Sequence, residues 1–198
     1  GSWARRGVEE TARKEHTVQI AVTPDPQRWV IIPPFPPPGW AREEARHRSA
    51  HLGVTGPQWR SELESLLNEL QAMERQGRFA RLMHIDDVAH PPFVIDLSLE
   101  IAKDDGSKEG RRATQRQLVA ALLPEAELVR LRPGPDMVGF SAFYESNGPT
   151  QGVVVLRLAG LPTVPVDLVM RLWGAAAEDI APNLDHPIEL ARQVAPGV

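Results

Sequence analysis

The segment His84–His90 (HIDDVAH) is the densest group of residues in the chain that could do chemistry. His84, Asp86 and His90 offer two imidazoles and a carboxylate, a donor set that suits a divalent transition metal. A metal held in this way can activate water for hydrolysis. The alternative interpretation is a strand end followed by a polar loop, in which aspartates accept hydrogen bonds from backbone amides. The spacing matches no established metal motif, so both interpretations stay open.

Other candidate sites are less well supported. His47 and His51 lie one helical turn apart, as in the zinc-protease motif His-Glu-x-x-His. That motif has a glutamate directly after the first histidine, but this chain has Arg48 there. A solvated helix face is therefore the better interpretation. Ser141 lies inside an alternating strand pattern, and Phe143 replaces the second glycine of a nucleophile elbow. Neither glycine-rich phosphate loop occurs, and we expect no cofactor.

The composition excludes several classes of protein. The chain of 198 residues has no cysteine, which excludes disulfides, thiolate zinc sites and cysteine nucleophiles. Its net charge of -4 lacks the clustered positive charge that a nucleic-acid-binding domain needs. No apolar run approaches the roughly 20 residues that span a bilayer. We therefore expect no nucleic-acid partner and no transmembrane segment.

The beginning of the chain is set apart by its composition. Gly1 and Ser2 resemble the residues that remain after a purification tag is cleaved. Residues 1–15 are polar and charged, which predicts a flexible arm ahead of a single domain at 16–198. Only three of the 22 Lys and Arg residues are lysine, a bias that favours an actinobacterial source. We expect a cytoplasmic protein, or an exported or membrane-anchored one if a leading segment has been removed.

The hydrophobic pattern beyond the arm predicts both helices and strands. The clearest helix follows Pro57, with apolar residues at helical spacing from Trp59 to Met73 and Gly77 just beyond its end. Further helical segments are predicted at 40–52, 112–123 and, interrupted by two prolines, 175–194. Strands are predicted at 16–23, 28–32, 78–85, 93–102, 127–132, 138–145, 153–159 and 166–173.

The connections between these segments predict the fold class. The first two strands flank a strong turn, Thr23–Pro26, and are predicted to pair as a hairpin. A polar tip is predicted at 104–110, and Asn147–Gly148 predicts a further turn. Short connections favour antiparallel pairing over a series of parallel crossovers. Together they predict an α+β fold, a single-domain sandwich whose mainly antiparallel sheet is covered by helices.

The segment Ile31–Trp40 (IIPPFPPPGW) is rich in proline between aromatic residues. Its P-x-x-P spacing is typical of ligands for SH3 or WW domains, but no basic residue stands directly beside the prolines. Prolines also fix an extended backbone at low entropic cost, so a rigid corner inside the fold is the leading interpretation. The alternative is a partner-binding ridge made of Phe35, Pro36, Pro37 and Trp40, because exposed aromatic side chains anchor interfaces.

The order of these segments resembles the PsbP-like/LpqN-like group of α/β/α sandwiches. The similar elements are an IP…W corner at Trp29–Trp40, a GxxAY-like element at Gly139–Tyr144, and a last strand and helix at Val166–Val194. The proline-rich corner and the long helical insert Trp40–Gly77 depart from that group, and no lipobox cysteine is present. The resemblance implies a partner-binding protein without catalytic residues.

Three hypotheses about function follow. The first is a non-enzymatic adaptor, assembly factor or secretion-associated chaperone that binds another protein through Phe35 and Trp40. The second is a metal-assisted hydrolase that uses His84, Asp86 and His90. The third is a small-ligand carrier with an apolar pocket between sheet and helix.

Overall fold

The computed structural model describes residues 20–134, 137–144, 150–158, 165–175 and 185–196. The helices in these ranges are α1 (Trp40–His51), α2 (Pro57–Ala72), α3 (Lys108–Leu122) and α5 (Asp185–Arg192). The strands are β1 (Ile20–Val22), β2 (Trp29–Ile31), β3 (Ala80–His84), β4 (Phe93–Ile101), β5 (Glu127–Gly134), β6 (Met137–Tyr144), β7 (Thr150–Arg157), β8 (Val166–Ala175) and β9 (Val194–Pro196). Within the described ranges, no helix has the length and apolar character that a membrane span requires.

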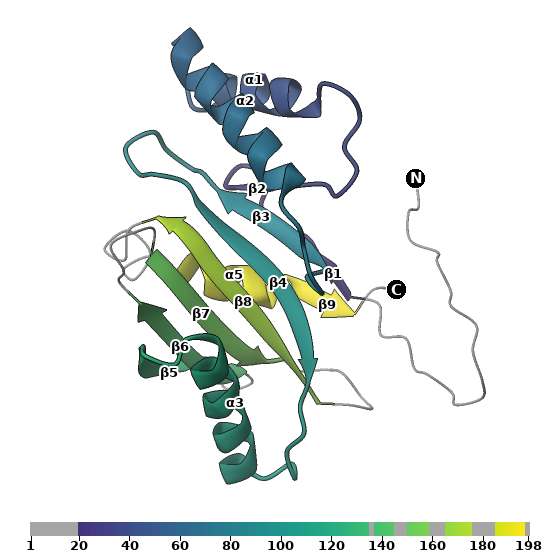
Figure 1. Cartoon of the computed structure of the whole chain (residues 1–198), viewed down its shortest axis with the longest axis vertical. Helices are drawn as coiled ribbons and strands as arrows, with labels where there is room; N and C mark the ends of the chain where they lie inside the picture. Colours follow the sequence, from purple (N-terminus) through teal and green to yellow (C-terminus); the bar gives the residue numbers. More distant parts are fainter. Residues whose placement is uncertain (1–19, 135–136, 145–149, 159–164, 176–184, 197–198) are drawn as a thin grey trace, which may run out of the picture.

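Seven of these strands form one sheet, in the order β2-β3-β4-β8-β7-β6-β5 (Figure 1). Every neighbouring pair is antiparallel. Strands β5 to β8 follow one another as a meander, whereas the β4–β8 pair joins segments that are distant in sequence. The prediction of a single α+β domain with a mainly antiparallel sheet is confirmed.

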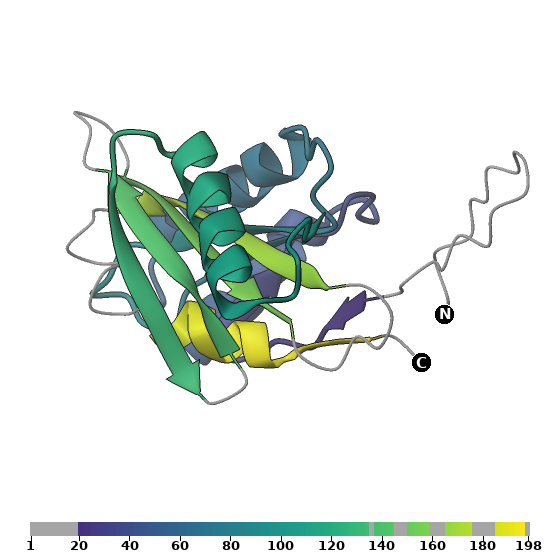
Figure 2. The same ribbon diagram turned by 90° about the horizontal axis from the view of Figure 1, so that it is seen from below.

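Helices cover both faces of this sheet (Figure 2). On one face, α1 and α2 pack over β2 and β3, and α3 packs over β6 and β7. On the opposite face, α5 packs on the central strands beside the two-stranded β1–β9 ribbon. Because successive side chains of a strand alternate between the faces, β3 sends Arg81 and Met83 towards α2 and sends Leu82 and His84 towards α5.

The prediction that the first two strands form a hairpin is wrong. Strand β1 pairs with β9, and β2 pairs with β3 so that Trp29 lies opposite His84. Burial explains the difference, because Trp29 is 5% exposed and Val30 is 3% exposed although they point to opposite faces. A strand that is buried on both faces needs cover on both sides, which the large sheet provides and an isolated hairpin does not.

The boundaries of two other predicted segments also change. Helix α3 begins at Lys108, because the side chain of Ser107 accepts a hydrogen bond from the amide of Gly110 and caps the helix. Three of the seven residues of the predicted polar tip at 104–110 are therefore helical. The predicted closing helix is described only from Asp185 to Arg192, and the chain then turns into β9. The predicted arm at 1–15 and the predicted turn at Asn147–Gly148 lie outside the described residues.

Arg81 fixes the end of α2 to the sheet. Its guanidinium is fully buried and donates to the backbone carbonyls of Leu70, Met73 and Glu74 at 2.7–3.2 Å. Its Nε and Nη2 donate to the carboxylate of Asp96, on β4, at 2.6 and 3.1 Å. All five N–H groups of this arginine therefore have an acceptor, and three carbonyls at and just beyond the end of α2 accept hydrogen bonds from it.

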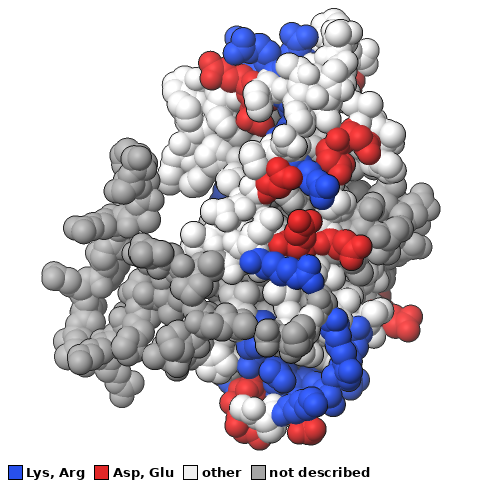
Figure 3. Space-filling view, turned by 180° about the vertical axis from the view of Figure 1, so that it is seen from behind, with Lys and Arg blue, Asp and Glu red and all other residues white. Residues whose placement is uncertain are grey.

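The sheet ends at β2 and β5, and β5 carries two arginines, Arg130 and Arg132. Arg112 and Arg132 lie close enough to Arg130 to repel its charge. Seen from behind, Lys and Arg side chains gather at the lower end of the molecule, whereas acidic and basic side chains are mixed higher up (Figure 3). Charged side chains on an edge strand oppose pairing with the edge of another sheet, which gives these arginines a structural reason.

Candidate functional site

His84 is held at the end of β3 by aromatic neighbours. The ladder places Trp29 on one side of it and Phe93 on the other. The His84 ring stacks on Phe93, with centroids 4.8 Å apart, and meets Trp29 edge to face at 4.8 Å. The residue is only 6% exposed. The sheet therefore fixes this imidazole in one orientation.

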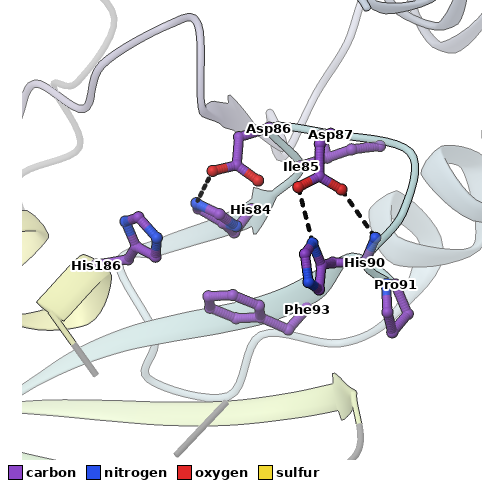
Figure 4. Close-up of a pocket in the computed structure, with 8 residues that line it drawn as sticks. All are labelled: His84, Ile85, Asp86, Asp87, His90, Pro91, Phe93 and His186. Carbon is purple, nitrogen blue, oxygen red and sulfur yellow. Dashed lines mark hydrogen bonds and ion pairs between the residues drawn. The ribbon is translucent and has the colours of Figure 1, made fainter. Parts of the chain in front are cut away.

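Two further polar side chains converge on His84 (Figure 4). Asp86 follows β3 directly, and its Oδ2 lies 3.7 Å from His84 Nε2. His186 comes from the first turn of α5 on the same face of the sheet, and its ring centroid lies 4.5 Å from that of His84. One potential ligand atom from each of the three residues lies within 4.8 Å of the other two.

The environment keeps His84 uncharged. Burial lowers its pKa to about 4, with a further lowering from His186, although Asp86 acts in the opposite direction. Its Nε2 is buried and has no hydrogen-bond partner in the described structure. A buried polar atom without a partner is uncommon in folded proteins and needs an explanation. A neutral imidazole whose ring nitrogen has no partner is the form of histidine that binds a metal ion.

A cavity of about 120 Å³ opens beside these three side chains. Phe93 and Pro91 form part of its wall, and Asp87 and His90 also line it. It is large enough for several water molecules, since one water occupies about 30 Å³ in the liquid. The three polar groups therefore face a space that an ion and its water can occupy.

His90 makes a different interaction from the one the sequence analysis assigned to it. Its Nδ1 lies 2.8 Å from Asp87 Oδ2, and the other oxygen of Asp87 accepts hydrogen bonds from the amides of Ala89 and His90. The hydrogen bond from the His90 side chain is the main cause that lowers the pKa of Asp87. Asp87 thus caps the loop, as the polar-loop interpretation requires, while His84 and Asp86 stay candidate metal ligands.

The sequence analysis did not identify His186. This residue lies in the segment predicted to be a proline-interrupted helix, far along the chain from His84. Nothing in its neighbourhood is typical of a metal ligand. Only the packing of α5 against the sheet brings the two histidines together.

The proline corner divides into a packed part and an exposed part. Trp40 is half-buried and packs against the cluster between the sheet and helices α1 and α2. Pro36 is half-buried, Pro37 is exposed, and Phe35 is 92% exposed. The side-chain amide of Gln71 on α2 donates to the carbonyl of Pro34 at 3.5 Å. Phe35, Pro36, Pro37 and Trp40 nevertheless line one groove, so the ridge stays a prediction.

The remaining candidates have structural explanations. Ser141 is fully buried inside β6, where it cannot reach a substrate. His47 and His51 are exposed on α1, as a solvated helix face requires. Arg48 between them is buried and donates to the carbonyls of Gln27 and Trp29, which ties α1 to the start of β2.

Comparison with known proteins gives no relative from which a function could be transferred: no family model matches the chain, and no curated protein or solved structure matches it at a significant level. The resemblance to the PsbP-like/LpqN-like group stays an expectation.

Proposed function

We propose that the protein binds a divalent transition-metal ion through His84, Asp86 and His186 and acts as a metal-assisted hydrolase. The observation that carries this proposal is the meeting of these three ligand atoms around a buried imidazole nitrogen that has no hydrogen-bond partner among the described residues. Two histidines and one carboxylate are the ligand set of several catalytic zinc sites, which keep a further position open for water.

The three ligand atoms have to move closer together to hold a metal. Zinc binds nitrogen and carboxylate oxygen at about 2.0–2.2 Å in tetrahedral sites, so two of its ligand atoms lie about 3.4 Å apart. The present set, within 4.8 Å, has to contract by up to about 1.4 Å. Asp86 is partly exposed and His186 half-buried, so both have more freedom to move than His84, which is clamped between Trp29 and Phe93.

The neighbouring residues suit hydrolysis. A bound zinc ion lowers the pKa of its water ligand to about 7 and so supplies hydroxide at neutral pH. The Asp87–His90 pair lines the same cavity, and a histidine oriented by a carboxylate is a common general base or acid. In this proposal His90 transfers protons beside the metal and is not a ligand.

Metal content tests the ligand set. Purified protein is titrated with Co²⁺ and Zn²⁺, followed by the visible absorption of Co²⁺ and by elemental analysis. We expect one equivalent in the wild type and a loss of affinity in His186→Ala that exceeds the roughly 10- to 100-fold cost of removing a group behind a ligand. His90→Ala is the matched control and should keep the metal. Loss of metal in His90→Ala but not in His186→Ala would favour the ligand set His84, Asp86 and His90. Metal binding that neither variant weakens would contradict both ligand sets.

Turnover tests the reaction. The zinc-loaded protein is assayed with p-nitrophenyl acetate, p-nitrophenyl phosphate and bis-p-nitrophenyl phosphate. We expect hydrolysis of one of these esters that is lost in His186→Ala and reduced by about 10²- to 10⁴-fold in His90→Ala, the usual contribution of a general acid or base. A stoichiometric metal with no turnover of any of the three would leave a metal site and refute the hydrolase assignment.

A second candidate function is protein binding at the proline corner. It is favoured by Phe35, an aromatic side chain that is 92% exposed on a segment whose backbone the prolines restrict. Affinity capture with wild-type protein and a folded Phe35→Ala variant tests it. A partner lost with Phe35 would support an adaptor, and equal capture would make the corner purely structural.

A further inference from the structure

A second cavity, of about 400 Å³, lies on the face of the sheet that carries α2 and α3. The two helices pack at opposite ends of that face (Figure 1), and the cavity lies between their C-terminal ends. Its volume is within the range of about 300–1,000 Å³ that is typical of small-molecule sites. His84 points to the other face, so this cavity is separate from the proposed metal site.

The floor of this cavity carries Arg171, from β8. This arginine is half-buried, and it makes no hydrogen bond or ion pair with any other residue in the described part of the chain. In the ladder it lies directly opposite Asp96 on β4, the acidic residue best placed to pair with it. A half-buried guanidinium without an anion is costly, because burial removes part of its hydration.

The carboxylate of Asp96 is shared by two other guanidinium groups and makes no hydrogen bond or ion pair with Arg171. Oδ1 accepts from Arg81 at 2.6 Å, and Oδ2 accepts from Arg81 at 3.1 Å and from Arg78 at 3.0 Å. Two guanidinium groups therefore share this carboxylate, and Arg171 and Arg78 both border the cavity. The local balance is an excess of positive charge, whereas the chain as a whole carries -4.

Apolar side chains form the rest of the cavity. Leu122 and Leu123 come from the end of α3, and Met73 comes from the residue after α2. Met73 is 45% exposed and offers apolar surface at the edge of the cavity. Val153 and Trp173 complete the apolar surface around Arg171. The cavity thus combines apolar walls with the guanidinium of Arg171, which has no ion-pair partner among the described residues.

We propose that this cavity binds a small organic carboxylate with an apolar body. A guanidinium pairs with a planar carboxylate through two parallel hydrogen bonds, which Arg171 has available. The apolar body of the ligand would cover Met73, Leu122 and Trp173 and remove their surface from water. Inorganic phosphate would meet the charge but not the walls, and a neutral lipid would meet the walls but not the charge.

Calorimetric titration with octanoate tests the proposal on the full 198-residue chain. Octan-1-ol and inorganic phosphate are the matched probes that lack the charge or the apolar body. We expect one octanoate per chain and at least about tenfold weaker binding in Arg171→Gln, since a charged hydrogen bond contributes about 1.5–3 kcal/mol. Arg130→Gln, which removes the same charge from an exposed position on β5, should change the affinity less than twofold.

An NMR measurement on the wild-type protein locates the site without relying on a variant. Octanoate should shift the indole N–H signal of Trp173 and leave that of Trp59, on α2 outside the cavity, in place. Binding should persist in EDTA and in His186→Ala, which separates it from the metal proposal. An unmoved Trp173 signal, equal binding of octan-1-ol or phosphate, absence of saturable binding, or equal loss in Arg130→Gln would each overturn the assignment.

Discussion

Arg81 and His84 lie three positions apart on β3 and point to opposite faces of the sheet, and their environments differ sharply. Arg81 is fully buried, and each of its N–H groups has an acceptor, either a carbonyl at the end of α2 or the carboxylate of Asp96. His84 is nearly as buried, yet its Nε2 has no hydrogen-bond partner in the described structure.

The difference separates a structural polar group from a candidate functional one. A buried charge is tolerated only when it is paired and its hydrogen bonds are made. Arg81 meets this condition, and its hydrogen bonds hold α2 on the sheet. A buried nitrogen without a partner costs stability and is kept where another requirement justifies it. By this reasoning Arg81 belongs to the scaffold, and His84 is a candidate for the proposed metal site.

The largest expected effect comes from removing the counter-charge of Arg81. Asp96→Asn leaves the buried guanidinium of Arg81 without its counter-charge, and we expect the free energy of unfolding to fall by about 3–5 kcal/mol. Urea unfolding followed by circular dichroism measures it. Glu100→Gln, the same kind of change at an exposed position of β4, is the control and should stay within about 0.5 kcal/mol. A loss below about 1 kcal/mol for Asp96→Asn would contradict the scaffold role.

The second effect is a pH dependence that His84 should cause in metal-free protein. The unfolded histidine has a pKa near 6.5 and the folded one near 4, so between these values the unfolded state binds more protons. Stability is complete above pH 6.5 and should decrease towards pH 4, by at most about 1.4 kcal/mol per pH unit. Below pH 4 this residue adds no further change.

Other groups also titrate in that range, so the contribution of His84 has to be isolated. The pKa values of Asp87 and Asp104 are lowered by their hydrogen bonds, to His90 and to Arg157 respectively. Urea unfolding at each pH gives the free energy of unfolding of wild type and of His84→Phe. The difference between the two values removes the contributions of the groups that both proteins share. Parallel stability curves for the two proteins would refute the lowered pKa of His84.

A smaller effect is expected when the unpartnered group itself is removed. His84→Phe keeps an aromatic ring between Trp29 and Phe93, and the neighbouring cavity has room for the larger phenyl group. At pH 7 and without metal we expect the free energy of unfolding to stay within about 1 kcal/mol of the wild type, because no hydrogen bond is lost. Metal binding should disappear. A large destabilisation would show that His84 has a structural partner.

Much of the fold could be predicted from the sequence because its strongest signals are local. The alternation in 93–102 and 166–173, and the apolar spacing from Trp59 to Met73, depend on neighbouring residues alone. The pairing of β1 with β9 could not be predicted, because three-residue strands carry almost no register information. Composition also gave no sign that α5 would end in a strand.

The candidate site was predictable only where its residues are close in sequence. His84 and Asp86 are two positions apart, so one short segment revealed both. His186 and the charge balance around Arg171 depend on contacts between distant strands and helices, which no local pattern records. His90 was predicted to be a metal ligand because it lies in the same short segment, but its Nδ1 is hydrogen-bonded to Asp87 Oδ2.

The smallest expected effect on the free energy of unfolding concerns the proline corner, where a packed side chain, Trp40, can be compared with an exposed one, Phe35. Trp40 packs into the cluster beneath α1 and α2, so Trp40→Ala should lower the free energy of unfolding by about 2 kcal/mol, less than for a fully buried tryptophan. Phe35 is 92% exposed, so Phe35→Ala should change it by less than about 0.5 kcal/mol. Thermal and urea unfolding of both variants measure the difference. Equal losses would mean that Phe35 is packed in solution, which would remove the reason to consider it a surface for a partner.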